Sequence, residues 1–184
     1  MLPRPGLTAG ETIVVTGASG GVGTALVQLA KLRGARVVAV TTASKFDDVA
    51  ACGADVLVDR SSGDLSGAVA EAAGGPVDVW ADVVGGPDFA PLLELLRRGG
   101  RYTTAGAIAG PMVELDLRTL YLNDLELYGC TVYGPEVFTA LVGYIERGEV
   151  RPVVAGTFPL TDIHAAQEAF VAKRHTGNLV ITVD

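Results

Sequence analysis

The sequence contains few aromatic residues, few cysteines and histidines, and no long hydrophobic run. Aromatic side chains make up 6% of the 184 residues, whereas apolar residues make up 49%. An interior of small aliphatic side chains is typical of close-packed α/β layers and unlike a disordered chain. Cys52 and Cys130 are the only cysteines, and with two scattered histidines they form no metal-ligand motif. We expect free thiols and no bound zinc.

The chain also lacks an excess of positive charge. Its 14 Lys and Arg residues stand against 21 Asp and Glu residues, and the net charge is −7. This balance argues against nucleic acid and an anionic membrane as partners, because phosphate binding needs a basic surface. No segment reaches the roughly 18 uninterrupted apolar residues of a membrane span, and the first residues contain no signal-peptide core. We therefore expect a cytoplasmic location.

The most informative stretch runs from Thr12 to Gly23, with the sequence TIVVTGASGGVG. An apolar β-branched run ends in a glycine-rich turn, and apolar residues then recur at helical spacing. Strand, glycine turn and helix form the first half of a dinucleotide-binding βαβ unit, whose glycines allow a tight turn and close approach to a pyrophosphate. Ala18, Gly20 and Gly23 fill the three positions of G-x-G-x-x-G. The alternative is a tight strand–helix turn without a ligand.

The rest of the chain predicts an α/β fold with a doubly wound parallel sheet. We expect strands at 12–16, 35–41, 55–58, 77–84 and 101–105, and helices at 21–33, 44–51, 64–73 and 88–98. Right-handed crossovers give the order 3-2-1-4-5, and a sixth strand at 125–133 extends it to the Rossmann order 3-2-1-4-5-6. We divide the chain into a linker stub at 1–11, a dinucleotide-binding domain at 12–150 and a helix and strand appendage at 151–184.

Ligands of such sheets bind at the carboxyl ends of the strands, where the winding reverses. The loops that follow the strands would line this crevice. We therefore predict a cofactor site formed by Gly17, Ala18, Ser19, Gly20, Gly21, Val22, Gly23, Thr41, Thr42, Ser44, Lys45, Arg60, Val84, Gly85, Gly86, Gly106, Ala107 and Ile108.

The end of the second strand has no acidic residue. Sites that prefer NAD place one about 20 residues beyond the glycine turn, to hold the ribose hydroxyls. Here the sequence reads TTASK, and the first acid is Asp47. Ser44, Lys45 and Arg60 could hold a 2′-phosphate, so NADPH is favoured over NADH. The alternative is that Ser44 only caps a short helix and Lys45 is a solvated charge.

The segment TGASGGVG also fits the glycine turn of short-chain dehydrogenases, T-G-x-x-x-G-x-G. That family needs a catalytic Tyr-x-x-x-Lys, and none of the three lysines has a tyrosine four residues before it. The chain better resembles the cofactor domain of medium-chain dehydrogenase/reductases, in the zinc-free quinone oxidoreductase and enoyl reductase branch. The segments CGADVLVD, VDVWADVVGG, LRRGGRYTTAGAIAG and HTGNLVITVD follow that family's order and spacing.

The resemblance implies hydride transfer from NADPH to an activated double bond or a quinone. It implies a homodimer formed by pairing of the sixth strands, here Leu125 to Tyr133. It further implies a GroES-like substrate domain, separate or deleted, before the glycine turn. The chain would then be an excised domain or a cofactor domain encoded alone. A second hypothesis is a truncated, non-catalytic or non-redox module acting in dimerisation, regulation or partner docking.

The sequence offers only two weakly placed candidates for catalytic residues. Lys45 and Asp64 stand roughly where the resembled enoyl reductases place proposed proton donors. We expect Asp82 to be a half-buried, hydrogen-bonded carboxylate and Trp80 to be a core residue. His164 and His175 stand far along the chain from the crevice residues, and both are expected to be surface or packing residues. Asn178 replaces a lysine or arginine that is usual in the C-terminal motif of the resembled family.

Overall fold

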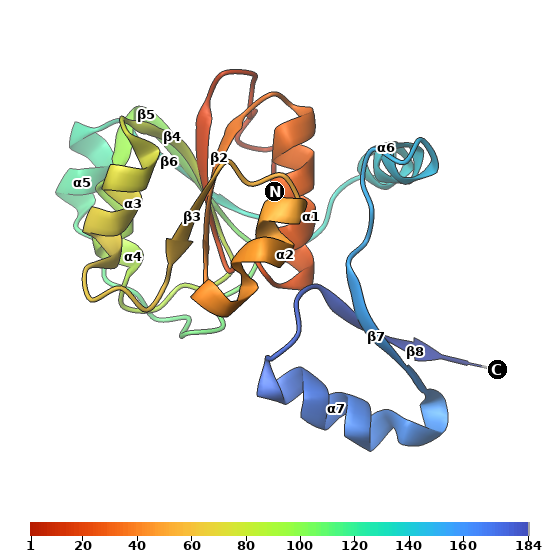
Figure 1. The fold of residues 1–184 in the computed structure, drawn as a ribbon. Coiled ribbons are helices and arrows are strands. Elements are labelled where there is room, and N and C mark those ends of the chain that lie inside the picture. Colours follow the sequence, from red (N-terminus) through yellow and green to blue (C-terminus); the bar gives the residue numbers. More distant parts are fainter. Residues whose placement is uncertain (184) are drawn as a thin grey trace.

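Residues 1–183 are described by a computed structural model, in which a parallel sheet is covered by helices on both faces (Figure 1). The sheet has six strands in the order β3-β2-β1-β4-β5-β6, as the sequence predicts. All five neighbouring pairs are parallel. The strands are β1 Thr12–Thr16, β2 Arg36–Thr41, β3 Val56–Asp59, β4 Val77–Asp82, β5 Leu96–Thr104 and β6 Glu126–Gly129.

The central strands are rich in valine because both of their faces are buried. Helices α1 (Gly21–Leu32) and α2 (Phe46–Ala51) cover one face, and their apolar side chains pack with those of β1 and β2. The opposite face packs against α3 (Leu65–Ala73), α4 (Phe89–Leu93) and α5 (Leu117–Leu122). Three rings lie in this second core, with centroid distances of 4.7 Å for Trp80–Tyr102 and 5.3 Å for Phe89–Tyr102. Trp80 is thus a core residue, as expected.

The chain after β6 leaves the sheet domain. Helix α6 (Pro135–Glu146) lies beside α1, and β7 (Val154–Pro159), α7 (Ile163–Ala172) and β8 (Asn178–Thr182) form a small unit to one side (Figure 1). Strands β7 and β8 pair in parallel as a separate sheet, and none of their residues is buried. This unit corresponds to the expected helix and strand appendage. In the described chain, no helix combines the length and apolar character needed to cross a membrane.

Residues 1–11 contain no helix or strand, as the prolines predict, but they pack on the domain. Leu2 and Leu7 are buried in the core under α1. The guanidinium of Arg33 donates to the Leu2 carbonyl at 3.2 Å, and that of Arg101 donates to the Pro5 carbonyl at 2.7 Å. The segment is therefore part of the packed structure in this fold.

The expected helix at 88–98 was wrong in its second half. Helix α4 ends at Leu93, and β5 begins at Leu96. Phe89, Leu92, Leu93 and Leu96 recur at helical spacing, which predicts the longer helix. Leu96 nevertheless belongs to the strand, where it is buried in the same core as Leu93. Arg97 is held by Asp78, with 2.5 Å between Nε and Oδ1, so its charge lies beside the start of β4 instead of at a helix end.

Strand β4 also ends earlier than expected, at Asp82 instead of residue 84. Gly85 and Gly86 have φ values of +62° and +76°, which extended strands do not adopt. The Asp82 carboxylate accepts hydrogen bonds from the amides of Val84 and Gly85 and turns the chain away from the sheet. A side chain that competes for local amides ends the strand here.

Replacement of Gly23 tests how α1 packs on the glycine turn. A Cβ at this position would lie 2.6 Å from the Cα of Ala18 and closer still to the Gly17 carbonyl oxygen. We expect Gly23→Ala to lower the free energy of unfolding by about 1–3 kcal/mol, measured by urea denaturation. Gly63→Ala is the matched control, because a Cβ there meets nothing within 4 Å. Equal effects of the two substitutions would contradict the packing described.

Candidate functional site

The glycine turn places the start of α1 at the carboxyl end of β1. Gly20 is the N-cap of this helix, and no side chain caps it or adds negative charge to its first turn. Gly17 turns the chain with a φ of +69°, and the Ala18 amide donates to the Val40 carbonyl at 3.1 Å. Unpaired first-turn amides at a positive helix end suit a pyrophosphate. The backbone of this turn therefore fits a dinucleotide.

A fully buried carboxylate fixes the neighbouring loops. Asp82 Oδ1 accepts hydrogen bonds from Thr16 Oγ1 at 2.5 Å and from the Val84 amide at 2.8 Å. Its Oδ2 accepts from the Gly85 amide at 3.0 Å and from Tyr102 Oη at 2.9 Å. These donors come from the end of β1, the loop after β4 and strand β5. Asp82 therefore joins three segments of the crevice through one side chain.

The donors themselves are held in the core. Trp80 Nε1 donates to Thr16 Oγ1 at 3.1 Å, which directs the threonine proton toward Asp82. Burial raises the pKa of Tyr102, so its phenol stays protonated and continues to donate. Because both carboxylate oxygens are satisfied by donors of the chain, Asp82 acts in positioning the loops. It is hydrogen-bonded as expected, but completely buried instead of half-buried.

The loops after β4 and β5 pack together. Residues Gly85 and Gly110 form an isolated β-bridge, and the Ala109 amide donates to the Val84 carbonyl at 2.8 Å. A Cβ on Gly85 would lie 2.7 Å from the Gly110 carbonyl oxygen, so a glycine is needed for this approach. The predicted residues of both loops, 84–86 and 106–108, are thereby brought to one wall of the crevice.

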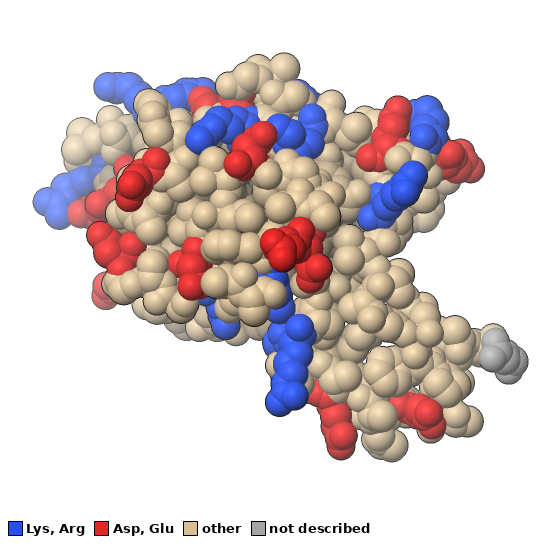
Figure 2. All heavy atoms as spheres, in the orientation of Figure 1, with Lys and Arg blue, Asp and Glu red and all other residues tan. Residues whose placement is uncertain are grey.

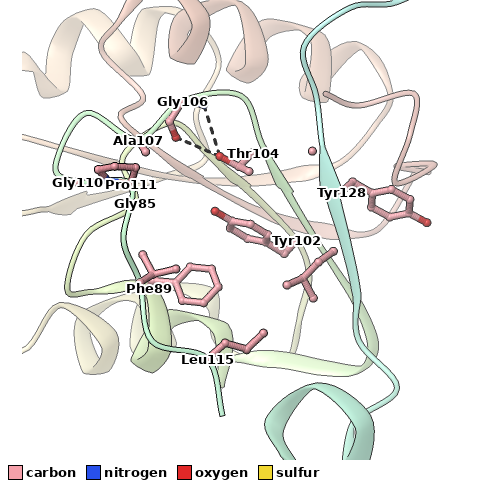
Figure 3. A pocket seen from close by; sticks show the side chains of 13 residues that line it. Gly85, Phe89, Tyr102, Thr104, Gly106, Ala107, Gly110, Pro111, Leu115 and Tyr128 are labelled. Atoms are coloured by element: carbon pink, nitrogen blue, oxygen red, sulfur yellow. Dashed lines mark hydrogen bonds between the residues drawn. The ribbon is translucent and has the colours of Figure 1, made fainter. Parts of the chain in front are cut away.

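A cavity of about 330 Å³ opens beside this wall (Figure 3). Gly85, Gly106 and Ala107 line its rim, and the side chains of Phe89, Tyr102 and Leu115 lie around its interior, whereas the ring of Tyr128 points away. Sequence patterns indicate Phe89 only as a core residue and gave no sign of the cavity, because it depends on how the loop after β5 folds back over the sheet. The crevice thus has an apolar end.

The predicted residues at the ends of β2 and β3 differ in exposure. Thr41 is buried, and its hydroxyl has no hydrogen-bond partner among the described residues. Ser44 and Arg60 are exposed. No side chain caps the 3₁₀ turn at Ala43–Lys45 or helix α2, so the alternative that Ser44 is a helix cap is wrong.

Lys45 is not a solvated surface charge. Its Nζ donates to the Lys173 carbonyl at 2.8 Å and to the His175 carbonyl at 2.7 Å. Burial lowers the pKa of Lys45, and the charge of Arg60 lowers it further. The structure therefore brings Lys45 and Arg60 together and adds a partner segment from the far end of the chain.

Residues 173–178 lie far along the chain from the glycine turn, but the fold returns them to it. His175 is partly buried, with its ring centroid 6.0 Å from that of Phe170, and is a packing residue as expected. The Gly177 amide donates to the Ser19 carbonyl at 2.8 Å, and Gly20 and Gly177 form an isolated bridge. His164 is exposed on α7, as expected. Sequence periodicity could not reveal this contact, because the segments lie far apart in the chain and neither contains a repeating pattern.

Asp64 lies at the start of α3 and caps it. Its Oδ1 accepts from the Gly67 amide at 2.9 Å and from Ser66 Oγ at 3.1 Å. These two hydrogen bonds, the amide bond first, lower the pKa of the exposed Asp64 carboxyl. A carboxyl that is more acidic than usual is a poorer proton donor at neutral pH. The geometry favours a capping role.

Both cysteines are free thiols, Cys130 buried and Cys52 partly buried. Within residues 1–183, no group of three His, Cys, Asp or Glu side chains is arranged to hold a metal ion.

The chain belongs to the zinc-binding dehydrogenase family, whose model matches residues 21–147. It is 35% identical over 183 residues to the acryloyl-coenzyme A reductase of Metallosphaera sedula, covering 98% of this chain and 53% of that protein. The NADPH-dependent alkenal/one oxidoreductase of Arabidopsis thaliana is 29% identical over 184 residues, which are 98% of this chain and 42% of that protein. The quinone oxidoreductases of Rattus norvegicus and Mus musculus are also among the relatives.

A solved structure from Sinorhizobium meliloti 1021, provisionally called an alcohol dehydrogenase, is 53% identical. It superposes with a TM-score of 0.96 over 100% of this chain and 51% of its own. The chain thus spans about half the length of the relatives it matches. These comparisons confirm the resemblance to the cofactor-binding half of medium-chain dehydrogenase/reductases and confirm the Rossmann-like fold.

Replacement of Asp82 tests its role as the link between the loops. In Asp82→Asn the amide group presents a donor to groups that already donate, so buried hydrogen bonds are lost at about 1–3 kcal/mol each. We expect this fall in the free energy of unfolding in urea denaturation. Asp88→Asn is the control, since Asp88 is exposed and makes no capping hydrogen bond. Two substitutions of equally small effect would show that Asp82 does not hold the loops.

Proposed function

We propose that this chain is the NADPH-binding part of a zinc-independent oxidoreductase. In the proposed reaction, hydride passes to an activated double bond, as in an enoyl thioester or an unsaturated ketone, or to a quinone. The observation that carries the proposal is the uncapped start of α1 facing loops that Asp82 holds. The names of the acryloyl-coenzyme A reductase and the alkenal/one oxidoreductase support this substrate class. The resemblance to the zinc-free branch supports the proposed zinc independence.

Different residues along the crevice would bind different groups of NADPH. The amides of Gly21 and Val22 would hold the pyrophosphate, and Ser44, Lys45 and Arg60 would hold the 2′-phosphate. The loops at 84–86 and 106–108 would contact the nicotinamide, which supplies the hydride when bound. Their small residues admit a flat ring, and Asp82 keeps them in place.

The catalytic proton donor is proposed to lie outside this chain. Asp64 is occupied as a helix cap, and Lys45 is occupied by main-chain carbonyls near the phosphate-binding end. A GroES-like substrate domain would supply that donor and most of the substrate pocket. The exposed strands β7 and β8 offer a surface for it, with Val154 at 51% exposure and Val180 at 38%. The cytoplasmic location stays a prediction.

The second candidate function is a non-catalytic module for dimerisation, regulation or docking. It is favoured by the apolar side chains around the edge strand β6, which include Leu127 at 38% exposure and Leu117, Tyr121 and Leu122 of α5 at 64%, 61% and 58%. This candidate shares the dimer with the first one. It differs in predicting that the folded chain does not bind NADPH.

Calorimetric titration with NADPH and NADH tests the cofactor. We expect NADPH to bind more tightly than NADH. Arg60→Met should weaken NADPH by about tenfold, roughly 1.4 kcal/mol, and leave NADH unchanged, because Arg60 acts only on the 2′-phosphate. Arg118→Met is the control, since Arg118 is exposed at the start of α5. A folded chain that binds neither nucleotide at millimolar concentration would contradict the proposal and favour the second candidate.

The proposed homodimer is tested by the mass of the chain in solution. An apolar edge strand is stabilised when a second strand pairs with it. We expect light scattering to give a dimer for the unmodified chain and a monomer for Leu127→Lys, which places charges at the paired edges. Val171→Lys, on α7 and 75% exposed, should remain dimeric. A monomeric unmodified chain, or a dimer that survives Leu127→Lys, would argue against pairing through β6.

A further inference from the structure

The C-terminal unit, defined as residues 151–183, is joined to the sheet domain through the elements of the cofactor site. The Gln28 side chain on α1 accepts from the Arg151 amide at 2.8 Å and donates to its carbonyl at 3.0 Å. The Gly177 amide bonds the Ser19 carbonyl in the glycine turn. Lys45, in the turn after β2, supplies two further hydrogen bonds. A shift of α1, the glycine turn or the turn after β2 would therefore also shift the C-terminal unit.

This attachment is thin. No residue of β7 or β8 is buried, and in α7 the only buried side chain is Ala166. Thr176, in the segment that touches the glycine turn, has a buried hydroxyl without a hydrogen-bond partner among the described residues. An unpaired buried hydroxyl disfavours the arrangement that contains it. Without a large apolar interface, the few polar contacts decide how firmly the unit is docked.

Lys45 stands in a cluster of like charges. Arg60 and Lys173 both lower its pKa by their charge, after the larger effect of burial, and Asp48 is the acid that acts on it. Figure 2 shows Lys and Arg side chains gathered where the loop after α7 meets the sheet domain. An ammonium group has three donors, and the carbonyls of Lys173 and His175 take two of them. One donor is left for an anion, which would also relieve the repulsion between the cations.

We propose that Lys45 is a positioning residue that couples binding of a nucleotide 2′-phosphate to docking of the C-terminal unit. The proposal rests on the NADPH function proposed above. With the phosphate bound, the cations attract a common partner, and Lys45 holds the carbonyls of Lys173 and His175 more firmly. A nucleotide without this phosphate leaves the repulsion in place. Because coupling is reciprocal, docking of the unit in turn strengthens binding of the phosphorylated nucleotide.

As a consequence, the preference for NADPH over NADH is larger than direct contacts with the 2′-phosphate alone would give. The strand pair β7–β8 would be held in its place beside the glycine turn more firmly with NADPH bound than with NADH. The two nucleotides then differ in how firmly the C-terminal unit is docked as well as in their affinity for the chain.

Amide hydrogen exchange, followed by mass spectrometry with saturating NADPH or NADH, tests the coupling. The reporters are the amides of Gly177 and Asn178, which bond the carbonyls of Ser19 and Val153. We expect NADPH to slow their exchange by about tenfold more than NADH does. In Lys45→Met the difference between the two nucleotides should disappear. Arg118→Met should behave like the unmodified chain.

The glycine turn provides the reference for the proposed function. If NADPH slows exchange at residues 17–23 but affects residues 175–178 no more than NADH does, the coupling is refuted and the NADPH site stands. If NADPH slows exchange nowhere, both proposals fail. Should Lys45→Met not fold, 2′,5′-ADP and 5′-ADP make the same comparison on the unmodified chain. Equal exchange at Gly177 with these two nucleotides would refute the coupling.

Discussion

The hydrogen-bonded carboxylate of Asp82 is the interaction on which the crevice depends. A charge with no exposed surface is tolerated only when its lone pairs are satisfied, and here four donors from three segments satisfy them. That requirement sets the positions of the β1 end and the loop after β4 relative to β5. The three meet at the carboxyl edge of the sheet, where the winding reverses. The buried carboxylate of Asp82 thus holds the end of β1, the loop after β4 and strand β5 together as one site.

The crevice that results has two chemically different ends. Toward β2 and β3 lie Lys45 and Arg60 with the carbonyls of the C-terminal unit, and toward β5 lies an apolar cavity of about 330 Å³. Between them, the start of α1 presents its first-turn amides without a cap. A phosphorylated dinucleotide has the same sequence of groups, with a charged ribose phosphate, a pyrophosphate and a flat ring. In the proposed function, this match is how a chain with net charge −7 would hold an anionic ligand.

Much of the fold could be predicted because short, local sequence patterns determine most of its strands and helices. The β-branched run before Gly17, the helical spacing after Gly20 and the alternation of strands and helices give the sheet order directly. The helix at 88–98 was placed too long because Leu96 continues a helical stripe, whereas its burial in β5 depends on the whole sheet. The Asp82 network and the return of residues 173–178 were also beyond prediction, since each depends on contacts between distant segments.

The most direct test of the account is an NMR titration of the backbone amides of this chain with NADPH. The largest shifts should fall on Gly20, Gly21 and Val22 at the start of α1 and on Val84 and Gly85, whose amides Asp82 holds. This would show that the phosphate-binding turn and the Asp82 loop form one site. Shifts confined to residues between α1 and α6, such as Leu26, Leu29, Val137 and Leu141, or a folded chain whose spectrum does not change, would contradict it.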